Sequence, residues 1–570
     1  DHYELDGPLP ALAIPTTLQE SLIARLDRLN TVKTIAQIGA CIGREFTHEL
    51  IATVSPLSDT DLGSAFQQLI EAQIILPQGG ATQGSYIFKH ALLQDAAYDS
   101  LLRGPKRQFH DRIADGLLSK FPDIVANTPE LVASHLAKAE RFTEALDHWK
   151  EAGLRATRAS SNQEAAHYFE SAIKILKKEA PSPLRDKREL ELQTPLGQVM
   201  IALYGYGAQQ TGAVYERAFA LSRNVENPPE LFQIMYGLSS NRLNGERFAE
   251  GLSIAKELAA YSDTAGEKVG YTIAHRWYAQ CLLWVPDFEK AKTHLENALG
   301  AYEEANFCRW VDEYGQDPKS LGLSYLAVVH NELGYLDQGT KLKQEAIAHT
   351  KTLNFPFGLA LTHWIAAFSG SSQGDLEEVR VNAEALAKIA DENDFPYHRS
   401  SALLLLGWAD HQQGKPDAFA KVQRGMKEME GLSSNSMTDF FPQRLLVESL
   451  IKEGDDKLAG SIIDRVLNFM EPLGSNWCEA DFWRLKALNC LSGKNCNRSE
   501  VESFLLRSLK ITESHKQRMW GIRTVLSLAK FWMEEQERQK AHDMLYTFYS
   551  EQPEGFDRPN MIEAKALLKQ

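Results

Sequence analysis

A loose repeat of about 40 residues recurs through most of this chain and constrains its fold more than any other feature. Each unit has a small residue, a bulky apolar residue four positions later, and a small or apolar residue three positions after that. This spacing places all three side chains on one face of a helix. The sets are Ala291, Leu295, Ala298; Val379, Ala383, Leu386; Ala418, Val422, Gly425; Ala459, Ile463, Val466; and, near the start, Ala145, Trp149, Ala152; Ala165, Phe169, Ala172.

Small residues on a helix face allow a second helix to approach closely, so each unit reads as a pair of amphipathic helices. Aromatic-Pro-aromatic segments at 355–357 and 395–397 recur with the same period, and proline is tolerated in the first turn of a helix. The pattern predicts a predominantly α protein whose tetratricopeptide-like helix pairs stack into an α-solenoid. Such arrays present binding surfaces.

The first hundred residues follow a different pattern. Apolar periodicity and capping signals predict helices near 18–29, 32–42, 47–54 and 59–72, and a further helix over 90–102. Between the last two, residues 74–77 and 86–89 read as strands of a hairpin around Gly79-Gly80. Helices followed by a hairpin predict a winged-helix domain over residues 1–104.

A charged, proline-containing stretch at 177–188 marks a second boundary. We therefore expect a helical connector with short helix pairs over residues 105–180, and the α-solenoid over residues 181–570. The sequence does not decide whether the solenoid is continuous through the irregular stretch at 304–318.

Composition excludes several classes of function. The formal net charge of −15 argues against a general nucleic-acid surface, and no apolar run approaches the roughly 18–20 residues that span a bilayer. Six scattered cysteines and the absence of a signal peptide favour a reducing, cytoplasmic setting. The chain does not begin with Met, and we expect it to be a piece of a longer protein.

Several segments together resemble the region downstream of the nucleotide-binding domain in large bacterial STAND-type regulatory ATPases, often fused to class III adenylate/guanylate cyclases. The resemblance covers nearly the whole chain, and the collinear set is more specific than any single segment. The matching segments are Ile14-Pro15-Thr16-Thr17-Leu18-Gln19, Ala24-Arg25-Leu26-Asp27-Arg28-Leu29, Ile42-Gly43-Arg44-Glu45-Phe46, residues 88–98, Tyr314-Gly315-Gln316-Asp317-Pro318, Glu554-Gly555-Phe556-Asp557 and residues 563–568.

The resemblance implies a winged-helix domain packed on an upstream nucleotide-binding domain, followed by repeats that sense a ligand or partner. The parent protein would then use ATP or ADP with Mg²⁺. This chain contains no Gly-x-x-x-x-Gly-Lys-Ser/Thr loop and no cyclase domain, so it offers no catalytic residue of its own. No standard zinc spacing occurs either, and no metal site or cofactor of the chain itself is expected.

His90 lies between a predicted strand and a predicted helix. In related STAND proteins a winged-helix histidine contacts the β-phosphate of ADP, and a helix N-terminus favours anions. The resemblance thus implies that His90 contacts the ADP phosphate once the missing ATPase domain is present. The alternative is that His90 only caps the helix or packs against Phe88 and Tyr98.

Arg25, Arg28 and Arg44 are candidates for contacts between domains. A winged helix also suggests DNA, but few basic residues lie near the hairpin. Solvated or salt-bridging arginines remain the simpler interpretation.

Gln316, Asp317 and Trp310 are the candidates for ligand or partner binding, because a loop at 304–318 inside the array would bring polar groups to its concave surface. Asp317 is also suited to cap the following helix, which is the simpler interpretation. The many aromatic residues of the array will mostly pack between repeats, although a minority on the inner helices could line a peptide groove. They are Trp277, Tyr278, Trp284, Trp310, Trp364, Trp408, Trp477, Trp483 and Trp520.

The sequence therefore predicts a non-catalytic sensor region of a signal-transduction ATPase that is linked to an adenylate/guanylate cyclase. A protein, peptide or small ligand would bind the array and act through the winged helix on the upstream domain, with no role for membrane or nucleic acid. Two alternatives stay open: a stand-alone repeat scaffold, and the sensor half of a LuxR-type transcriptional regulator.

Overall fold

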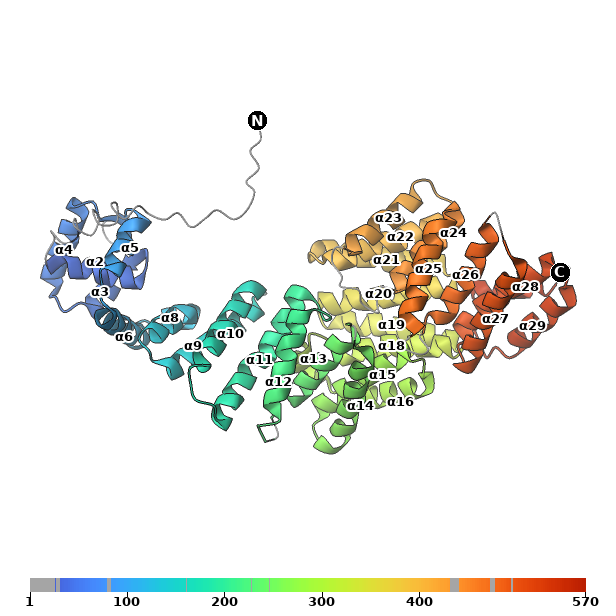
Figure 1. Ribbon diagram of the computed structural model, residues 1–570, viewed down its shortest axis with the longest axis horizontal. Helices are drawn as coiled ribbons and strands as arrows, with labels where there is room; N and C mark the ends of the chain where they lie inside the picture. Colours follow the sequence, from blue (N-terminus) through green and yellow to red (C-terminus); the bar gives the residue numbers. More distant parts are fainter. Residues whose placement is uncertain are drawn as a thin grey trace. The chain divides into compact units, whose positions relative to one another are not determined.

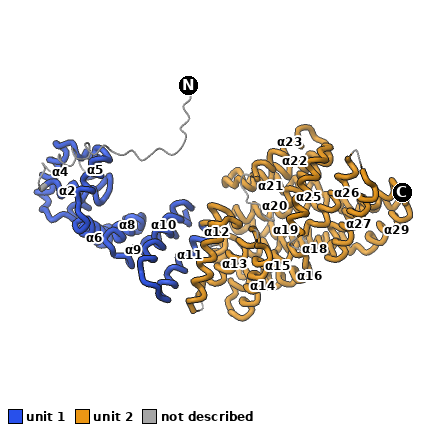
Figure 2. Tube along the Cα trace, in the orientation of Figure 1, with its two compact units in different colours: residues 1–199 blue, residues 200–570 orange. Residues whose placement is uncertain are grey.

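The computed structural model describes Leu26 and residues 31–570, apart from residues 79–83, 160, 227, 246, 431–439, 472–476, 494–495 and 570. The chain divides into two compact units, residues 1–199 and residues 200–570 (Figure 2). Helices dominate both units, as the sequence predicts (Figure 1).

Unit 1 begins with a small sheet surrounded by helices. The sheet order is β1-β3-β2, and β3 is antiparallel to both neighbours. The predicted hairpin is confirmed, with Ile75 opposite Phe88 and Gln78 opposite Ser85. The elements are α2 (Thr31–Ile42), β1 (Glu45–Thr47), α3 (His48–Val54), α4 (Asp59–Glu71), β2 (Ile75–Gln78), β3 (Ser85–Phe88) and α5 (Ala91–Asp99).

Strand β1 is an addition to the sequence prediction, which expects only a helix break there. It is three residues long, too short for an alternating pattern to be recognised. The buried Phe46 ring packs against Phe88 at a centroid distance of 5.5 Å and so holds β1 in place. The predicted turn at 79–80 lies outside the described residues.

Helix pairs complete unit 1. The repeat residues Ala145, Trp149 and Ala152 on α9, and Ala165, Phe169 and Ala172 on α10, are all buried, which confirms the small-bulky-small pattern. Of the stretch at 177–188, residues 177–182 connect α10 to α11 and the rest belongs to α11; the two units divide later, at 199/200, and the boundary at 180 stays a prediction. The helices are α6 (Arg103–Lys120), α7 (Pro122–Asn127), α8 (Pro129–Lys138), α9 (Phe142–Arg158), α10 (Asn162–Leu176) and α11 (Pro183–Tyr204), which runs across the unit boundary.

Unit 2 is an array of helix pairs (Figure 1). The first helices of the pairs are α13 (Leu231–Leu243), α15 (Lys268–Trp284), α18 (Pro318–Glu332), α20 (Pro356–Gln373), α22 (Pro396–Gln412), α24 (Phe440–Glu453), α26 (Glu479–Ser492) and α28 (Arg518–Glu534). Their partners are α14 (Phe248–Ala265), α16 (Phe288–Ala301), α19 (Leu336–Thr352), α21 (Leu376–Glu392), α23 (Ala418–Glu430), α25 (Asp456–Met470), α27 (Arg498–Ser514) and α29 (Arg538–Ser550). Helices α12 (Gln209–Ser222) and α30 (Pro559–Leu567) flank the array.

The 40-residue period is built into the turns. Gly334, Gly374, Gly414 and Gly454 follow four successive first helices at intervals of 40 residues, and each has a positive φ that glycine adopts without strain. Proline occupies the first helical position of α18, α20 and α22, which confirms the aromatic-Pro-aromatic entries. The repeat residues on α16, α21, α23 and α25 named above are buried.

The array is continuous through the region that the sequence leaves open. Residues 304–314 form the short helices η1 (Glu304–Asn306) and α17 (Phe307–Tyr314), while α16 still packs directly on α18. Farther on, α28 contacts α18 and α20, so the row of first helices winds back on itself within unit 2.

No helix in the described part of the chain is both long and apolar enough to cross a bilayer.

Candidate ligand-binding site

An apolar cavity of about 40 Å³ lies on the inner side of the unit 2 array. Every lining residue belongs to the first helix of a pair, except Trp477, which directly precedes α26. Successive first helices pack against one another, so side chains on their shared side converge. The lining consists of Gln280, Leu283, Trp284, Tyr325, Val328, Asn331, Trp364, Ile365, Phe368, Ser369, Ser372, Phe441, Trp477 and Met519.

Gln280 and Tyr325 mark the mouth of this cavity. Both are half-buried, whereas every other lining residue is buried. Arg276, one turn before Gln280 on α15, donates from Nη1 to Gln280 Oε1 at 2.5 Å. Burial raises the pKa of Tyr325 to about 12, and the nearby Arg276 charge opposes that rise. The Arg276 guanidinium therefore lies next to Gln280, a residue of the apolar lining.

Arg276 is fully buried, yet its Nε and Nη2 have no hydrogen-bond partner among the described residues. It forms no ion pair with any described carboxylate; its other charge contact is the Trp277 ring, 5.6 Å away. An unpaired buried charge is costly, and most buried charges are paired.

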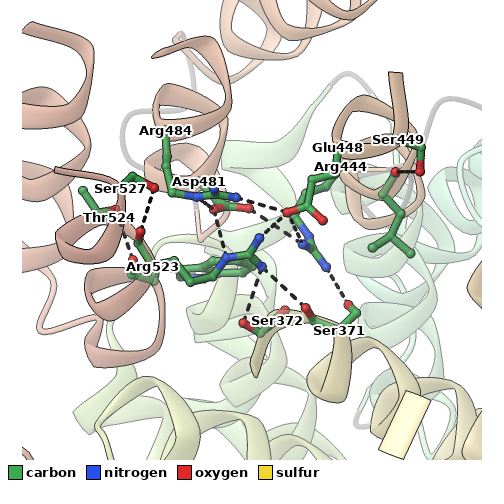
Figure 3. Close-up of polar contacts among 12 residues, drawn as sticks. Ser371, Ser372, Arg444, Glu448, Ser449, Asp481, Arg484, Arg523, Thr524 and Ser527 are labelled. Atoms are coloured by element: carbon green, nitrogen blue, oxygen red, sulfur yellow. Dashed lines mark hydrogen bonds and ion pairs between the residues drawn. The ribbon is translucent and has the colours of Figure 1, made fainter. Parts of the chain in front are cut away.

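A buried ion network adjoins the cavity at Ser372 (Figure 3). Arg444 on α24, Arg484 on α26 and Arg523 on α28 converge on the carboxylates of Glu448 and Asp481. Arg484 Nε lies 2.5 Å from Asp481 Oδ1, and Arg484 Nη2 lies 3.1 Å from Glu448 Oε1.

This network also reaches α20. Arg444 Nη2 donates to Ser371 Oγ at 2.5 Å, and Arg523 Nη1 donates to the Ser372 carbonyl oxygen at 3.4 Å (Figure 3). Carbonyl oxygens at the end of a helix carry partial negative charge, so α20 adds to the acceptors. Four first helices are thus joined through five charged side chains.

The charges of the network hold its carboxylates ionised. Burial alone would raise the pKa of Asp481, but Arg484, Arg523 and Arg444 lower it to about 2. The same arginines lower the pKa of Glu448 against the effect of burial.

Glu332 and Trp477 connect the network to the cavity. Trp477 lines the cavity and donates from its indole Nε1 to Glu332 Oε1, and burial together with the Asp481 charge raises the pKa of Glu332 well above its usual value. The Glu332 carboxyl therefore keeps its proton to a higher pH than an exposed glutamate does. Ser372 belongs to both features, since it lines the cavity and accepts from Arg523.

The structure places the predicted ligand candidates away from this cavity. Asp317 is the N-cap of α18, with its Oδ2 accepting from the Ser320 N–H at 2.8 Å, as the capping alternative predicts. Gln316 is buried and donates to the Tyr236 hydroxyl. Trp310 is fully buried and stacks on Tyr302 at 4.7 Å. None of the three lines the cavity, and their role in binding stays a prediction.

Among the aromatic residues that the sequence could not sort, Trp284, Trp364 and Trp477 line the cavity. Trp408, by contrast, donates to Glu448 at 3.0 Å, and Trp520 is fully buried with two arginines of the network over its ring.

In unit 1, His90 is exposed at the N-cap position of α5, and its side chain makes no capping hydrogen bond. Its role in binding ADP stays a prediction. Arg44 is exposed before β1. Arg25 and Arg28 lie outside the described residues.

The sequence analysis missed Arg276 and the arginines of the network. Each lies in a helix with apolar residues nearly all around it, and a single arginine there carries no local sign of burial.

No known protein-family profile matches the chain. Over 430 residues it is 22% identical to an uncharacterised protein, R02095, of Rhizobium meliloti (strain 1021); the match covers 74% of this chain and 41% of that protein. The chain thus spans less than half of that relative.

Solved structures with a similar arrangement include a signal transduction ATPase with numerous domains from Pyrococcus horikoshii, which has a tetratricopeptide repeat sensor. Its TM-score is 0.33 at 13% identity, covering 74% of this chain and 66% of that one. A Rap protein complexed with competence and sporulation factor has a TM-score of 0.41 at 13% identity, and the match covers 75% of this chain and 99% of that one. The Cut9–Hcn1 hetero-tetramer of APC/C has a TM-score of 0.43 at 12% identity, and the match covers 94% of this chain and 98% of that one.

Proposed function

We propose that this chain is the sensor region of a larger signal-transduction ATPase, and that its array binds a protein or peptide ligand on the inner side. The observation that carries the proposal is the cavity beside the ion network. Residues of α15, α18, α20, α24 and α28 line the cavity together with Trp477. A ligand held there contacts helices that are far apart in sequence and so favours one packing of the array over others.

In this proposal residues 1–104 are a winged-helix domain, residues 105–180 a connector and residues 181–570 the sensing array. The antiparallel β1-β3-β2 sheet, with β1 between α2 and α3, supports the winged helix. This domain would pack on an upstream nucleotide-binding domain that holds ATP or ADP with Mg²⁺. Arg25, Arg28 and Arg44 would contact that domain, and the exposed His90 would contact the ADP phosphate.

Ligand binding would then shift the winged helix, weaken the hold on ADP and release an effector, which we expect to be an adenylate/guanylate cyclase. The coupling is a free-energy difference between two states, so it acts in both directions. Nucleotide state must therefore depend on the array.

The test uses the parent protein with its upstream region. Its bound nucleotide and its nucleotide turnover are compared with those of a variant that lacks residues 200–570. We expect retained ADP in the parent and altered turnover in the variant; unchanged turnover contradicts a sensor role. A parent without a nucleotide-binding domain would favour the scaffold, and a DNA-binding effector would favour the transcriptional regulator.

His90→Ala tests the phosphate contact separately. Loss of bound ADP, with the exposed His167→Ala as a matched control in the same unit, is the expected result. Retained ADP would remove His90 from the proposal and leave the switch itself intact.

A further inference from the structure

We propose that the cavity and Arg276 together bind an apolar carboxylate, namely the last residue of a peptide with a free C-terminus and an apolar side chain. The inference deepens the proposed function and depends on it only for the idea that this ligand is a signal.

The buried charge beside the lining residue Gln280 is the first argument. Arg444 is as buried as Arg276 and Arg484 is nearly so, but both pair with Glu448 and Asp481. Arg276 has only the Gln280 amide oxygen, which leaves two of its nitrogens without partners in the described part of the chain. A guanidinium presents parallel N–H donors that match a carboxylate, so the missing partner has the chemistry of a carboxylate.

The lining of the cavity is the second argument. Its walls are mainly ring faces and aliphatic groups, among them Trp284, Trp364 and Phe368. A volume of about 40 Å³ exceeds the roughly 10–15 Å³ that one water requires, but the few polar groups make it a poor site for water. An apolar group of the size of one side chain fits this space.

The distance between the two features is the third argument. Gln280 lines the cavity and touches the Arg276 guanidinium, so the apolar and cationic parts are one side chain apart. The last residue of a peptide carries its side chain and its carboxylate on the same Cα. It can therefore place the side chain between Trp284 and Trp364 while the carboxylate reaches the rim at Gln280 and Tyr325.

The experiment uses the full 570-residue chain and the probe acetyl-Ala-Ala-Ala-Leu, with a free carboxylate or as the amide. Binding is followed by titration calorimetry and by the tryptophan emission, because Trp284, Trp364 and Trp477 line the cavity. We expect the carboxylate to bind about tenfold more tightly than the amide, as a charge-assisted hydrogen bond implies.

In Arg276→Gln this preference should fall below about twofold, whereas Arg276→Lys, which keeps the charge without the fork, should retain part of it. The exposed Arg465→Gln in α25 is the matched control and should keep the full preference. Circular dichroism and melting verify that each variant is folded, and the comparison of carboxylate with amide on the unmodified chain needs no variant.

Equal binding of carboxylate and amide, no binding of either at millimolar concentration, or a preference that survives in Arg276→Gln would each overturn the inference. If 4-methylpentanoate binds as tightly as the peptide, the ligand is a free acid and the peptide assignment is wrong. If the parent protein prefers the carboxylate but its nucleotide turnover does not change when the peptide is added, the binding site stands and the sensor role is wrong. If nucleotide turnover depends on the array but the chain binds carboxylate and amide equally, the sensor role stands and the carboxylate site is wrong.

Discussion

Asp337 and Glu554, 217 residues apart, cap each other's backbone: Glu554 Oε1 accepts the Asp337 N–H at 2.8 Å, and Asp337 Oδ2 accepts the Gly555 N–H at 3.2 Å. The first-turn N–H groups of α19 have no partner within the helix. A carboxylate there also interacts favourably with the positive end of the helix dipole. The segment before α30 is thereby held against the middle of the array, where Gln552 Nε2 also donates to the Gly334 carbonyl at 2.8 Å.

We expect Glu554→Ala to lower the free energy of unfolding by about 1–2 kcal/mol, the usual cost of losing an N-cap. Hydrogen exchange should speed up in residues 551–568 and in the first turn of α19, because both ends of the contact lose their partner. Glu554→Gln keeps an acceptor oxygen and should retain most of the stability. Equal exchange in wild type and Glu554→Ala would show that the contact holds nothing in solution.

Glu332 gives a prediction about pH. Its pKa is raised in the folded state, mainly by burial, so the folded carboxyl stays protonated while the unfolded one ionises near its usual value of about 4.3. The stability that it contributes is present below that pH and is lost as pH rises toward the folded pKa, by about 1.4 kcal/mol per pH unit.

Glu332→Gln removes this loss and keeps an oxygen for the Trp477 indole. Its melting temperature should therefore match that of the wild type near pH 4.5 and exceed it by a growing margin toward pH 7.5. Glu345→Gln, an exposed residue on α19, is the control and should show no such trend. A difference that does not change with pH would mean that Glu332 is ionised in the folded protein.

Local patterns in the sequence predict most of the helix pairs. Residues such as Ala383, Leu386 and Ile463 predict amphipathic helices, because the 3.6-residue period can be recognised within the sequence of a single helix. Burial of Ala459 follows from the same rule. The turn glycines from Gly334 to Gly454 repeat the period and could have fixed the boundaries of the pairs still better.

The candidate site could not be reached in this way. Arg523 meets Ser371 and Ser372 across about 150 residues, and Glu332 meets Trp477 across 145, so no local pattern links them. The Arg523 contact forms because α28 packs on α20, and the Glu332 contact joins α18 to the residue before α26. Nor does any pattern show that Arg276 is buried without a carboxylate, since a helical arginine is most often solvated.

His110 and His135 in unit 1 give a second prediction about pH. Their Nδ1 atoms lie 2.9 Å apart, so one ring donates and the other, which must be neutral, accepts. Burial lowers the pKa of His110 to about 4 and that of His135 to about 3. Unfolded histidines take up protons near pH 6.5, so stability is full above that pH and is lost as pH falls toward 4.

Each histidine should contribute a slope of about 1.4 kcal/mol per pH unit in that window. Hydrogen exchange of α6 and α8, corrected for its intrinsic pH dependence, should therefore show lower protection at pH 5 than at pH 7. His135→Gln should roughly halve the slope, while the exposed His167→Gln should leave it unchanged. Protection that is constant from pH 7 to pH 5 would contradict the neutral pair.

The last prediction concerns the small residues of the repeat. A Cβ on Gly425 of α23 would lie 2.7 Å from the Leu404 backbone nitrogen and 2.9 Å from the Ser400 carbonyl oxygen, both in α22. Backbone atoms of a helix cannot move aside singly, so the two helices of the pair would have to separate. Gly425→Ala should therefore lower the free energy of unfolding by about 2–3 kcal/mol, within the range for an overpacked core.

Gly300→Ala is the matched control, because Gly300 is exposed on α16 and a Cβ there meets nothing within 4 Å. It should raise stability by about 0.5–1 kcal/mol, since alanine loses less backbone entropy in a helix. Thermal melts of both variants test this. If Gly425→Ala lowers and Gly300→Ala raises the melting temperature, the close approach of the two helices requires a small residue at the third repeat position. A stabilised Gly425→Ala would show instead that α22 and α23 are loosely packed there, and helix propensity alone would then explain both results.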